Sequence, residues 1–191
     1  MVRFQRGDSD ALGVLVRRHE VRLYNFALRH LRSPPAAEDV VQEVFLRVVE
    51  GAGTFQHASR FTTWAYTIAR NRCIDHTRRA SLRRHPSLDA PGDGADGDGA
   101  PLGERLADPG ASVERQALGG ELSVRIVAAV EALPDDQREV FLLRQIAALP
   151  FAAIAEIVDV PENTVKSRMR YALDRLKLAL GDFEEYARAL R

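Results

Sequence analysis

The middle of the chain contains a stretch that cannot form part of a hydrophobic core. Residues 86–111 read PSLDAPGDGADGDGAPLGERLADPGA, which is rich in Gly, Asp, Pro and Ala and almost free of large apolar side chains. The little apolar surface that it could bury would not offset the entropy lost on ordering. We therefore expect a flexible acidic linker over 85–116, which divides the chain into folded parts at 1–84 and 117–181. We interpret it as a spacer, rather than as a segment that binds a partner or covers basic surfaces.

Both parts carry apolar side chains at three- and four-residue spacing, which is typical of amphipathic helices. The N-terminal part predicts three helices, at 9–32 with a break near His19, at 35–50 and at 61–80. Ser33 is expected to cap the second of them, because two prolines follow it and suit a first helical turn. The third is expected to bury an apolar stripe made of Trp64, Ala65, Ile68, Ala69 and Ile74.

The C-terminal part predicts four further helices, at 118–132, 135–147, 150–158 and 162–180. The sequence Leu-Pro-Asp at 133–135 separates the first pair, and its aspartate is expected to be an N-cap. No stretch alternates between apolar and polar residues for long enough to predict a strand. The expected fold class is therefore all-α, with two small helical domains joined by a flexible linker.

The formal net charge of zero conceals a strong partition of charge along the chain. Residues 1–84 hold 15 Lys and Arg against 8 Asp and Glu, whereas residues 85–119 hold 2 against 7. In the last predicted helix, residues 164–177 hold 5 against 1. Because salt screens exposed charges beyond about 8–10 Å, these local basic patches matter more to a nucleic acid than the sum does.

Composition excludes several other kinds of protein. The single cysteine, Cys73, allows no internal disulfide and no CxxC metal site, which suits a reducing cytosol. No apolar run is long enough to span a membrane, and the first residues lack the apolar stretch of a signal peptide. We expect a cytoplasmic protein without a membrane span or a cofactor. Cys73 and His76 lie one helical turn apart, but zinc needs further ligands, so a half-buried thiol beside a surface histidine is preferred.

Residues 150–180 have the length and the polarity pattern of a helix-turn-helix. The first helix is expected to pack through Ala152, Ile154, Ala155 and Val158 against Val165, Met169, Ala172 and Leu173 of the second. Polar side chains gather at the start of the second helix, where such a helix enters the major groove. A solvated helix face is the alternative, but the short first helix, the turn and this cluster together favour DNA contact. The candidate DNA-binding residues are Asn163, Thr164, Lys166, Ser167, Arg168 and Arg170.

Several segments resemble, in order, those of the extracytoplasmic-function (ECF) sigma factors of bacterial RNA polymerase. IAEIVDVPENTVKSRMRYALDRLK resembles the region 4 helix-turn-helix, and LPDDQREVFLLRQI resembles the helices that open that region. AEDVVQEVFLRVVE resembles region 2.2, and FTTWAYTIARNRCIDHTRR resembles regions 2.3 and 2.4. The matches cover most of the chain outside the linker. The chain departs from the family at Ala152 and Ala153, where many members carry an acidic residue, and at Asp159, where Gly is common, so its promoter preference stays open.

The resemblance implies a sigma factor that binds core RNA polymerase and directs promoter-specific transcription initiation, and not an enzyme. Region 2 would dock on the clamp helices of the largest polymerase subunit and would recognise and melt the minus-10 element. Region 4 would bind the minus-35 element as double-stranded DNA and the flap of the second-largest subunit. Family members are usually held by an anti-sigma factor, so an anti-sigma factor is an expected partner.

The resemblance also indicates where region 2 would meet the polymerase. Asp39, Gln42 and Glu43 form an acidic-polar strip, opposite a stripe of valines that includes Val44, and could meet a basic partner. An ordinary solvated face would look the same in sequence. Phe45 and Leu46 suit either a core or an interface.

A melted minus-10 base needs stacking surfaces, hydrogen-bond donors and cations for its backbone. The stretch from Gln56 to Trp64 offers all three, although Phe61 and Trp64 also suit a core, which is the preferred interpretation for Trp64. The candidates for contacts to the melted strand and the adjacent duplex are Gln56, His57, Ser59, Arg60, Arg70, Asn71, Arg78 and Arg79.

Two other classes of protein explain less of the sequence. A stand-alone helix-turn-helix regulator would bind palindromic operator DNA tightly as a dimer, without polymerase. A nuclease or nucleotide hydrolase would need a constellation of Asp, Glu and His or a phosphate-binding loop, and the sequence offers neither.

Overall fold

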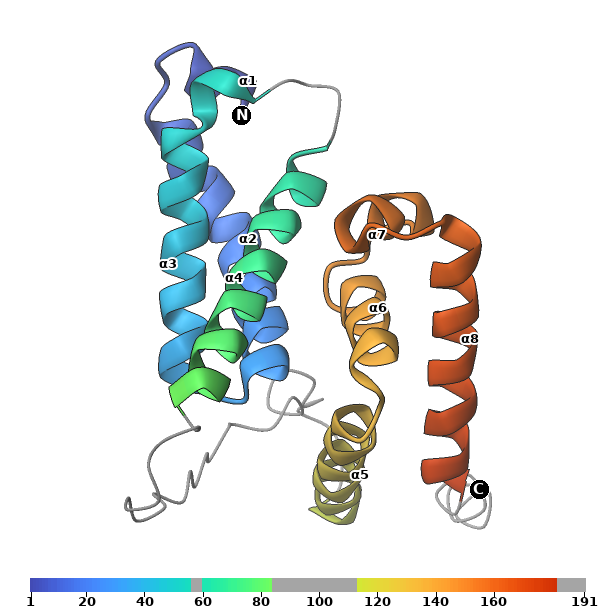
Figure 1. Ribbon diagram of the computed structural model, residues 1–191. Helices are drawn as coiled ribbons and strands as arrows, with labels where there is room; N and C mark the ends of the chain where they lie inside the picture. Colours follow the sequence, from blue (N-terminus) through green and yellow to red (C-terminus); the bar gives the residue numbers. More distant parts are fainter. Residues whose placement is uncertain (56–59, 84–112, 182–191) are drawn as a thin grey trace. The chain divides into compact units, whose positions relative to one another are not determined.

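The computed structural model describes residues 1–55, 60–83 and 113–181 (Figure 1). Every regular element among these residues is a helix, which confirms the all-α fold class. The range predicted for the linker, 85–116, lies mostly outside the described residues, although helix α5 (Val113–Glu131) begins inside it. None of the described helices is long and apolar enough to cross a membrane.

The N-terminal helices follow one another along the chain with short connections. Helix α2 runs without interruption through His19, so the predicted break there is wrong: residues 14–31 contain neither Gly nor Pro to interrupt a helix. Ser33 caps α3 as predicted, since its hydroxyl accepts a hydrogen bond from the Ala36 N–H at 3.5 Å. The elements are α1 (Val2–Gln5), α2 (Asp10–Leu31), α3 (Pro34–Glu50), the 3-10 turn η1 (Ala52–Thr54) and α4 (Phe61–Arg83).

Helices α2, α3 and α4 pack together and enclose one hydrophobic core. Phe26 of α2 is fully buried, and its ring meets that of Tyr66 in α4 edge-on, with the centroids 5.4 Å apart. Cys73 is completely buried in α4 rather than half-buried, because it continues the apolar stripe of that helix. The other residues of this core with at most 2% of their surface exposed are Leu23, Ala27, Ala37, Val40, Val44, Val48, Ala65 and Ala69.

The hydroxyl of Tyr66 is buried and has no hydrogen-bond partner among the described residues. An unpaired buried hydroxyl destabilises a fold by about 1–3 kcal/mol. We therefore expect Tyr66→Phe to raise the free energy of unfolding by about 1 kcal/mol in a urea titration. The same change at the half-exposed Tyr171 should have no effect. A Tyr66→Phe variant less stable than the wild type would show that the hydroxyl is satisfied after all.

Burial also raises the pKa of Tyr66 well above its ordinary value, and the charge of Arg22 only partly opposes the rise. The folded chain thus holds this proton more tightly than the unfolded chain. This difference leaves the free energy of unfolding unchanged below about pH 10, the pKa of an unfolded tyrosine, and lowers it as the pH rises further. Above pH ~10 the unfolding free energy of the wild type should fall more steeply than that of Tyr66→Phe, and equal slopes would contradict this account.

The C-terminal helices are α5, α6 (Asp135–Gln145), α7 (Phe151–Val158) and α8 (Glu162–Ala179). Asp135 was predicted to cap α6, but it is the first residue of that helix, and its carboxylate accepts a hydrogen bond from Nη2 of Arg138 at 2.7 Å. Nη1 of Arg138 also donates to the Glu131 carbonyl at 3.3 Å. This arginine therefore ties the end of α5 to the start of α6.

A short turn joins α7 to α8, as the sequence predicts (Figure 1). Asp159 ends α7 in the left-handed conformation at φ 54°, and the Val160 N–H donates to the Ala155 carbonyl at 3.3 Å. The loop before α7 is held by Arg144, which donates to the Leu149 carbonyl at 2.8 Å and lies over the Phe151 ring at 5.0 Å.

The buried face of α7 differs from the predicted one. Ile154 and Val158 are buried as expected, but Ala152 is exposed and Ala155 is partly exposed. The remaining buried positions of α7 are Ala153 and Ile157, which lie on the same side of the helix as Ile154 at three- and four-residue spacing.

The buried face of α8 follows the prediction for most of its length. Val165, Met169 and Ala172 are buried, but Leu173 is 47% exposed and Leu176 is buried instead. Leu176 continues the three- and four-residue spacing of the first three residues, whereas Leu173 lies about 100° around the helix from its neighbour Ala172.

Candidate nucleic-acid interface

The start of α8 presents a row of polar side chains away from its buried stripe. Asn163, Lys166, Ser167 and Arg170 are exposed, and Thr164 is partly exposed. The structure therefore leaves five of the six residues predicted to contact the minus-35 element accessible from solvent.

Arg168, the sixth predicted residue, has an internal partner. Its Nε lies 3.1 Å from Oδ2 of Asp136 at the start of α6, and only about a quarter of its side chain is exposed. Asp136 was not predicted to have a role. The two residues lie on different helices, so no spacing rule within one helix could have paired them.

Tyr171 extends the exposed row of α8 and was also missed. It lies one helical turn after Ser167 and is 50% exposed. The guanidinium of Arg170 lies 5.1 Å from the centre of its ring, and Nη2 of Arg170 donates to its hydroxyl at 3.4 Å. The sequence did contain a signal for Tyr171, because this aromatic residue lies four positions after Ser167, a predicted DNA contact.

The acidic-polar strip of α3 lies on the surface of the N-terminal helices. Asp39 and Gln42 are exposed and Glu43 is partly exposed, around a shallow pocket of about 310 Å³. Leu46, which suited either core or interface, is 62% exposed beside them, and Phe45 is partly buried. We call Asp39, Gln42, Glu43 and Leu46 the docking strip.

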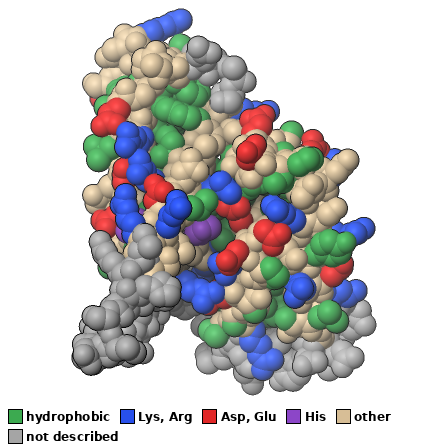
Figure 2. Space-filling model, viewed as in Figure 1, with side chains coloured by type: hydrophobic (Ala, Val, Ile, Leu, Met, Phe, Trp, Pro, Cys, Tyr) green, Lys and Arg blue, Asp and Glu red, His purple; other side chains and the backbone are tan. Residues whose placement is uncertain are grey.

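Glu43 also links two helices. Its carboxylate pairs with Arg72 of α4 at 3.2 Å and, more loosely, with Arg47 of its own helix at 3.9 Å. Acidic, basic and hydrophobic side chains alternate on the face over α3 and α4 (Figure 2). Glu43 therefore fixes the geometry of the docking strip as well as belonging to it.

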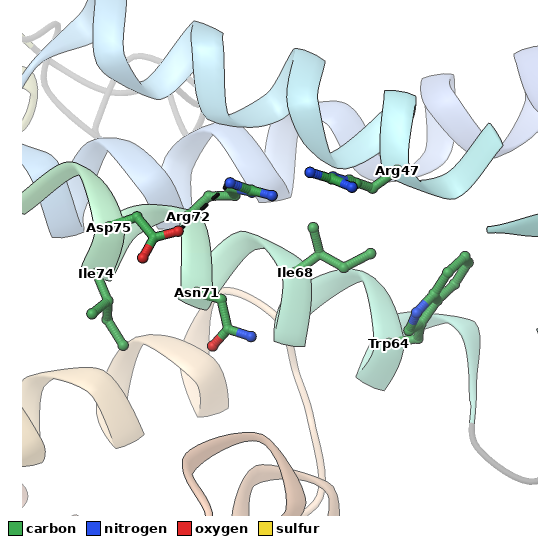
Figure 3. Close-up of a pocket in the computed structure, with 7 residues that line it drawn as sticks. All are labelled: Arg47, Trp64, Ile68, Asn71, Arg72, Ile74 and Asp75. Carbon is green, nitrogen blue, oxygen red and sulfur yellow. Dashed lines mark ion pairs between the residues drawn. The ribbon is translucent and has the colours of Figure 1, made fainter. Parts of the chain in front are cut away.

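A groove of about 630 Å³ lies beside this link, between α3 and α4. Trp64, Ile68 and Asn71 follow one another along α4, with Arg47 on the facing wall (Figure 3). At the far end Arg72 pairs with Asp75 at 3.6 Å. The groove thus offers an aromatic surface, an amide and guanidinium groups within one hollow.

Trp64, Ile68 and Ile74 were expected to face the core, and all three line this groove instead. Ile74 is 39% exposed, which contradicts its predicted burial. Trp64 is partly exposed, and its ring lies 4.9 Å from that of Phe55 and 6.3 Å from that of Phe61. Trp64 and Ile74 lie at the border of the apolar stripe of α4. The packing of α3 on α4 therefore decides whether each side chain is buried in the core or lines the groove.

The residues predicted for the minus-10 element fall into three groups. Gln56, His57 and Ser59 lie outside the described residues. Asn71 lines the groove and is exposed, and Arg70 is partly exposed on the same helix. The exposed arginines Arg60, Arg78 and Arg79 lie toward the two ends of α4.

The loop that leads to residue 56 is held by the N-terminal segment, which the sequence had not indicated. The side-chain amide of Gln5 donates to the carbonyls of Ala52 and Phe55, at 2.8 and 2.9 Å. These bonds fix the position of Phe55, whose ring supports Trp64. Among the described residues, no three His, Cys, Asp or Glu side chains gather in a way that could hold a metal ion.

Gly51 lies directly against Trp64. A Cβ at Gly51 would lie 3.0 Å from Cζ2 of Trp64 and 3.0 Å from the Arg47 carbonyl, whereas Gly53 has open space around it. We expect Gly51→Ala to displace the indole, to shift the emission of this single tryptophan to longer wavelength and to cost about 1 kcal/mol of stability. Gly53→Ala should leave the emission unchanged. Identical spectra for the two variants would show that Gly51 does not position Trp64.

The fold and these surfaces define an all-helical DNA-binding protein of the helix-turn-helix class. Residues 15–83 match the family described as Sigma-70 region 2, and residues 123–176 match that described as Sigma-70, region 4. The chain is 30% identical over 178 residues to the ECF RNA polymerase sigma factor SigW of Bacillus subtilis, covering 93% of each chain. It is 33% identical to the RNA polymerase sigma-H factor of Pseudomonas aeruginosa, covering 93% of this chain and 90% of that one. The chain therefore belongs to the ECF sigma factor family.

Solved structures of sigma factors share the fold. The sigma factor RpoE of Bartonella quintana, in complex with the anti-sigma factor NepR, has a TM-score of 0.62 at 20% identity, covering 87% of this chain and 96% of that chain. CnrH, in complex with the cytosolic domain of CnrY, has a TM-score of 0.62 at 21% identity, covering 93% and 92%. The all-helical fold described above is thus that of known sigma factors.

Proposed function

We propose that this chain binds core RNA polymerase and directs it to promoters by reading two promoter elements with two parts of the chain. The observation that carries this proposal is that one chain combines two kinds of surface. The region 2 helices carry the docking strip and the groove, and the region 4 helix-turn-helix carries the exposed polar row of α8. The proposed division is region 2 at 1–84, a linker at 85–116 and region 4 at 117–181. The chain would act in the cytoplasm, where the polymerase is found, and without enzymatic activity of its own.

The docking strip is the proposed site for the clamp helices of the largest polymerase subunit. It combines an exposed leucine with carboxylates and an amide, which is the usual composition of an apolar contact inside a polar rim. Its negative charge would attract a basic partner. Asp39 and Gln42 would make the direct contacts, while Glu43 keeps its bond to Arg72.

The groove between α3 and α4 is the proposed site for the minus-10 element. A base that leaves the duplex loses its stacking and pairing energy, which a protein must replace with an aromatic surface and hydrogen-bond partners. Trp64 and Asn71 supply one of each, and Arg47 could neutralise the backbone. This use of Trp64 replaces its predicted role in the core, since the ring is accessible.

The exposed row of α8 is the proposed reader of the minus-35 element. Asparagine can pair with adenine, lysine and arginine with guanine, and the hydroxyls with phosphates. The half-exposed Tyr171 would extend the contact beyond Ser167. The family implies that region 4 also binds the flap of the second-largest polymerase subunit.

An anti-sigma factor is the further proposed partner. RpoE of Bartonella quintana is bound to the anti-sigma factor NepR, and CnrH to the cytosolic domain of CnrY. An anti-sigma factor that covers the docking strip would block the surface with which this chain is proposed to bind the polymerase. The two partners would then compete for one surface.

Footprinting tests the proposed function against the rival operator-binding regulator. The full chain mixed with core polymerase should protect two DNA segments about two helical turns apart, and the free chain should protect neither strongly. A strong footprint on a palindrome by the free chain, unchanged when core polymerase is added, would favour the stand-alone regulator instead.

A further inference from the structure

Helix α2 carries arginines to which neither the sequence nor the family assignment gives a role. Arg18, Arg22 and Arg29 follow one another at four- and seven-residue spacing and therefore share one side of the helix. Arg18 and Arg22 are exposed and Arg29 is partly exposed. The row extends over roughly 16 Å of helix axis, at 1.5 Å per residue. We call these three residues the α2 basic strip.

The arginines of the α2 basic strip lack partners among the residues that the structure describes. No side-chain ion pair or hydrogen bond to a described residue engages any of the three. Arginines on other helices do have such carboxylate partners: Arg47 pairs with Glu50 and Arg168 with Asp136. The positive charge of the strip is therefore not neutralised by the described part of the chain.

A series of ring contacts links the start of the strip to the proposed minus-10 groove. Its first two members flank His19, whose ring lies 5.2 Å from that of Phe61 at the start of α4, and Phe61 in turn meets Trp64 edge-on. Burial lowers the pKa of His19, and repulsion from Arg18 and Arg22 lowers it further. The histidine thus joins the aromatic cluster as a neutral ring, while the charge stays with the arginines.

The opposite charges of the docking strip on α3 and the α2 basic strip point to different partners. The docking strip on α3 holds two carboxylates and suits a basic protein surface, which the α2 basic strip would repel. The α2 basic strip contains no aromatic residue on which a base could stack, so single-stranded DNA would gain little there. A row of guanidinium groups without a carboxylate partner among the described residues instead suits the phosphates of a duplex, which recur on each strand every ~3.4 Å of helix axis.

We propose that the α2 basic strip binds the phosphate backbone of the promoter duplex that borders the melted minus-10 bases. The proposal rests on the proposed function, because it needs the aromatic groove to hold those bases. The strip would add affinity without adding sequence preference, since phosphates carry no sequence information. It would also hold the duplex edge while the bases beside it leave the stack.

The test compares two variants of the full chain, each assembled with core polymerase. One is Arg18→Gln/Arg22→Gln/Arg29→Gln, and the matched control is Arg17→Gln, an exposed arginine of the same helix that lies off the strip. Promoter binding is measured as a function of salt on a duplex that carries a promoter selected by the wild-type holoenzyme. Binding to core polymerase is measured in parallel.

Each lost phosphate contact should reduce the slope of log affinity against log salt by about 0.9. For three contacts, the slope of the triple variant should be smaller than that of the wild type by about 2.7. Between 50 and 200 mM salt, its affinity should therefore fall about 40-fold less than that of the wild type. Arg17→Gln should keep the wild-type slope, and both variants should bind core polymerase normally.

Three results would overturn the assignment. A wild-type slope in the triple variant would show that the strip does not touch DNA. A slope lost on the single-stranded minus-10 oligonucleotide but kept on the duplex would assign the strip to melted DNA. Weakened binding to core polymerase would assign it to the polymerase. If the wild-type chain itself fails to bring core polymerase to any promoter, the proposed function fails, and that outcome is seen before any variant is compared.

Discussion

Replacement of Asp39 and Gln42 by arginine is expected to lower the affinity of the chain for core RNA polymerase about 100-fold. Both side chains are exposed at the docking strip, next to Leu46. Two guanidinium groups there would face a basic partner, and like charges across an interface cost several kcal/mol. A 100-fold loss corresponds to about 2.7 kcal/mol, which is comparable to that penalty.

The fold should be unaffected by this double substitution, because neither side chain makes an ion pair or hydrogen bond to a residue that the structure describes. The control Glu38→Arg reverses a charge on an exposed residue of the same helix, outside the pocket of the docking strip. The Kd for purified core polymerase, measured for all three proteins by fluorescence anisotropy, separates the effects. If Glu38→Arg weakens binding as much as the double substitution, general charge and not this surface would explain the loss.

Replacement of Arg168 by alanine is expected to weaken binding to the minus-35 element by about 1–3 kcal/mol, or about 5- to 150-fold. The contact to Asp136 engages Nε, and a guanidinium has five N–H donors, so others are left for a base or a phosphate. A partner that holds the side chain in place would reduce the entropy lost when DNA binds. Arg175→Ala, an exposed arginine farther along α8, should have a much smaller effect.

A charge exchange decides whether Arg168 acts on DNA or only ties α8 to α6. In Asp136→Arg/Arg168→Asp the ion pair can form again in the reverse direction. We expect minus-35 binding to stay weak in this variant, because an aspartate would face the DNA from position 168. Recovery of wild-type binding would remove Arg168 from the contact set and leave it a structural role. The pair is partly exposed, so its own stabilising effect should be within about 0–1 kcal/mol.

The parts of the structure that were predictable depend on neighbours along the chain. A helix repeats every 3.6 residues, so the apolar spacing located every described helix except the short α1 to within a few residues. Ser33 was found by its local capping chemistry. The same spacing separated the polar row of α8 from Val165, Met169 and Ala172. The candidate minus-35 residues follow from that separation.

The missed features depend on packing between helices. Two ion pairs, Glu43 with Arg72 and Arg168 with Asp136, each join two helices. The spacing of residues within one helix cannot predict either pair. Ile74 and Trp64 are as apolar as core residues, and only the packing of α3 on α4 leaves them in a groove. An apolar side chain at the border of a stripe can therefore be a binding residue, which for Trp64 changes its proposed role from core to minus-10 contact.

Transcription in vitro tests the central claim most directly. Purified core polymerase is incubated with a genomic promoter library, with and without the full chain, and the transcripts are mapped to their starts. The account predicts defined transcripts only when the chain is present, and their loss with the Asp39→Arg/Gln42→Arg variant. If the chain never produces a defined transcript from any promoter in the library, it is not acting as a sigma factor, and the roles proposed for its surfaces fall with that claim.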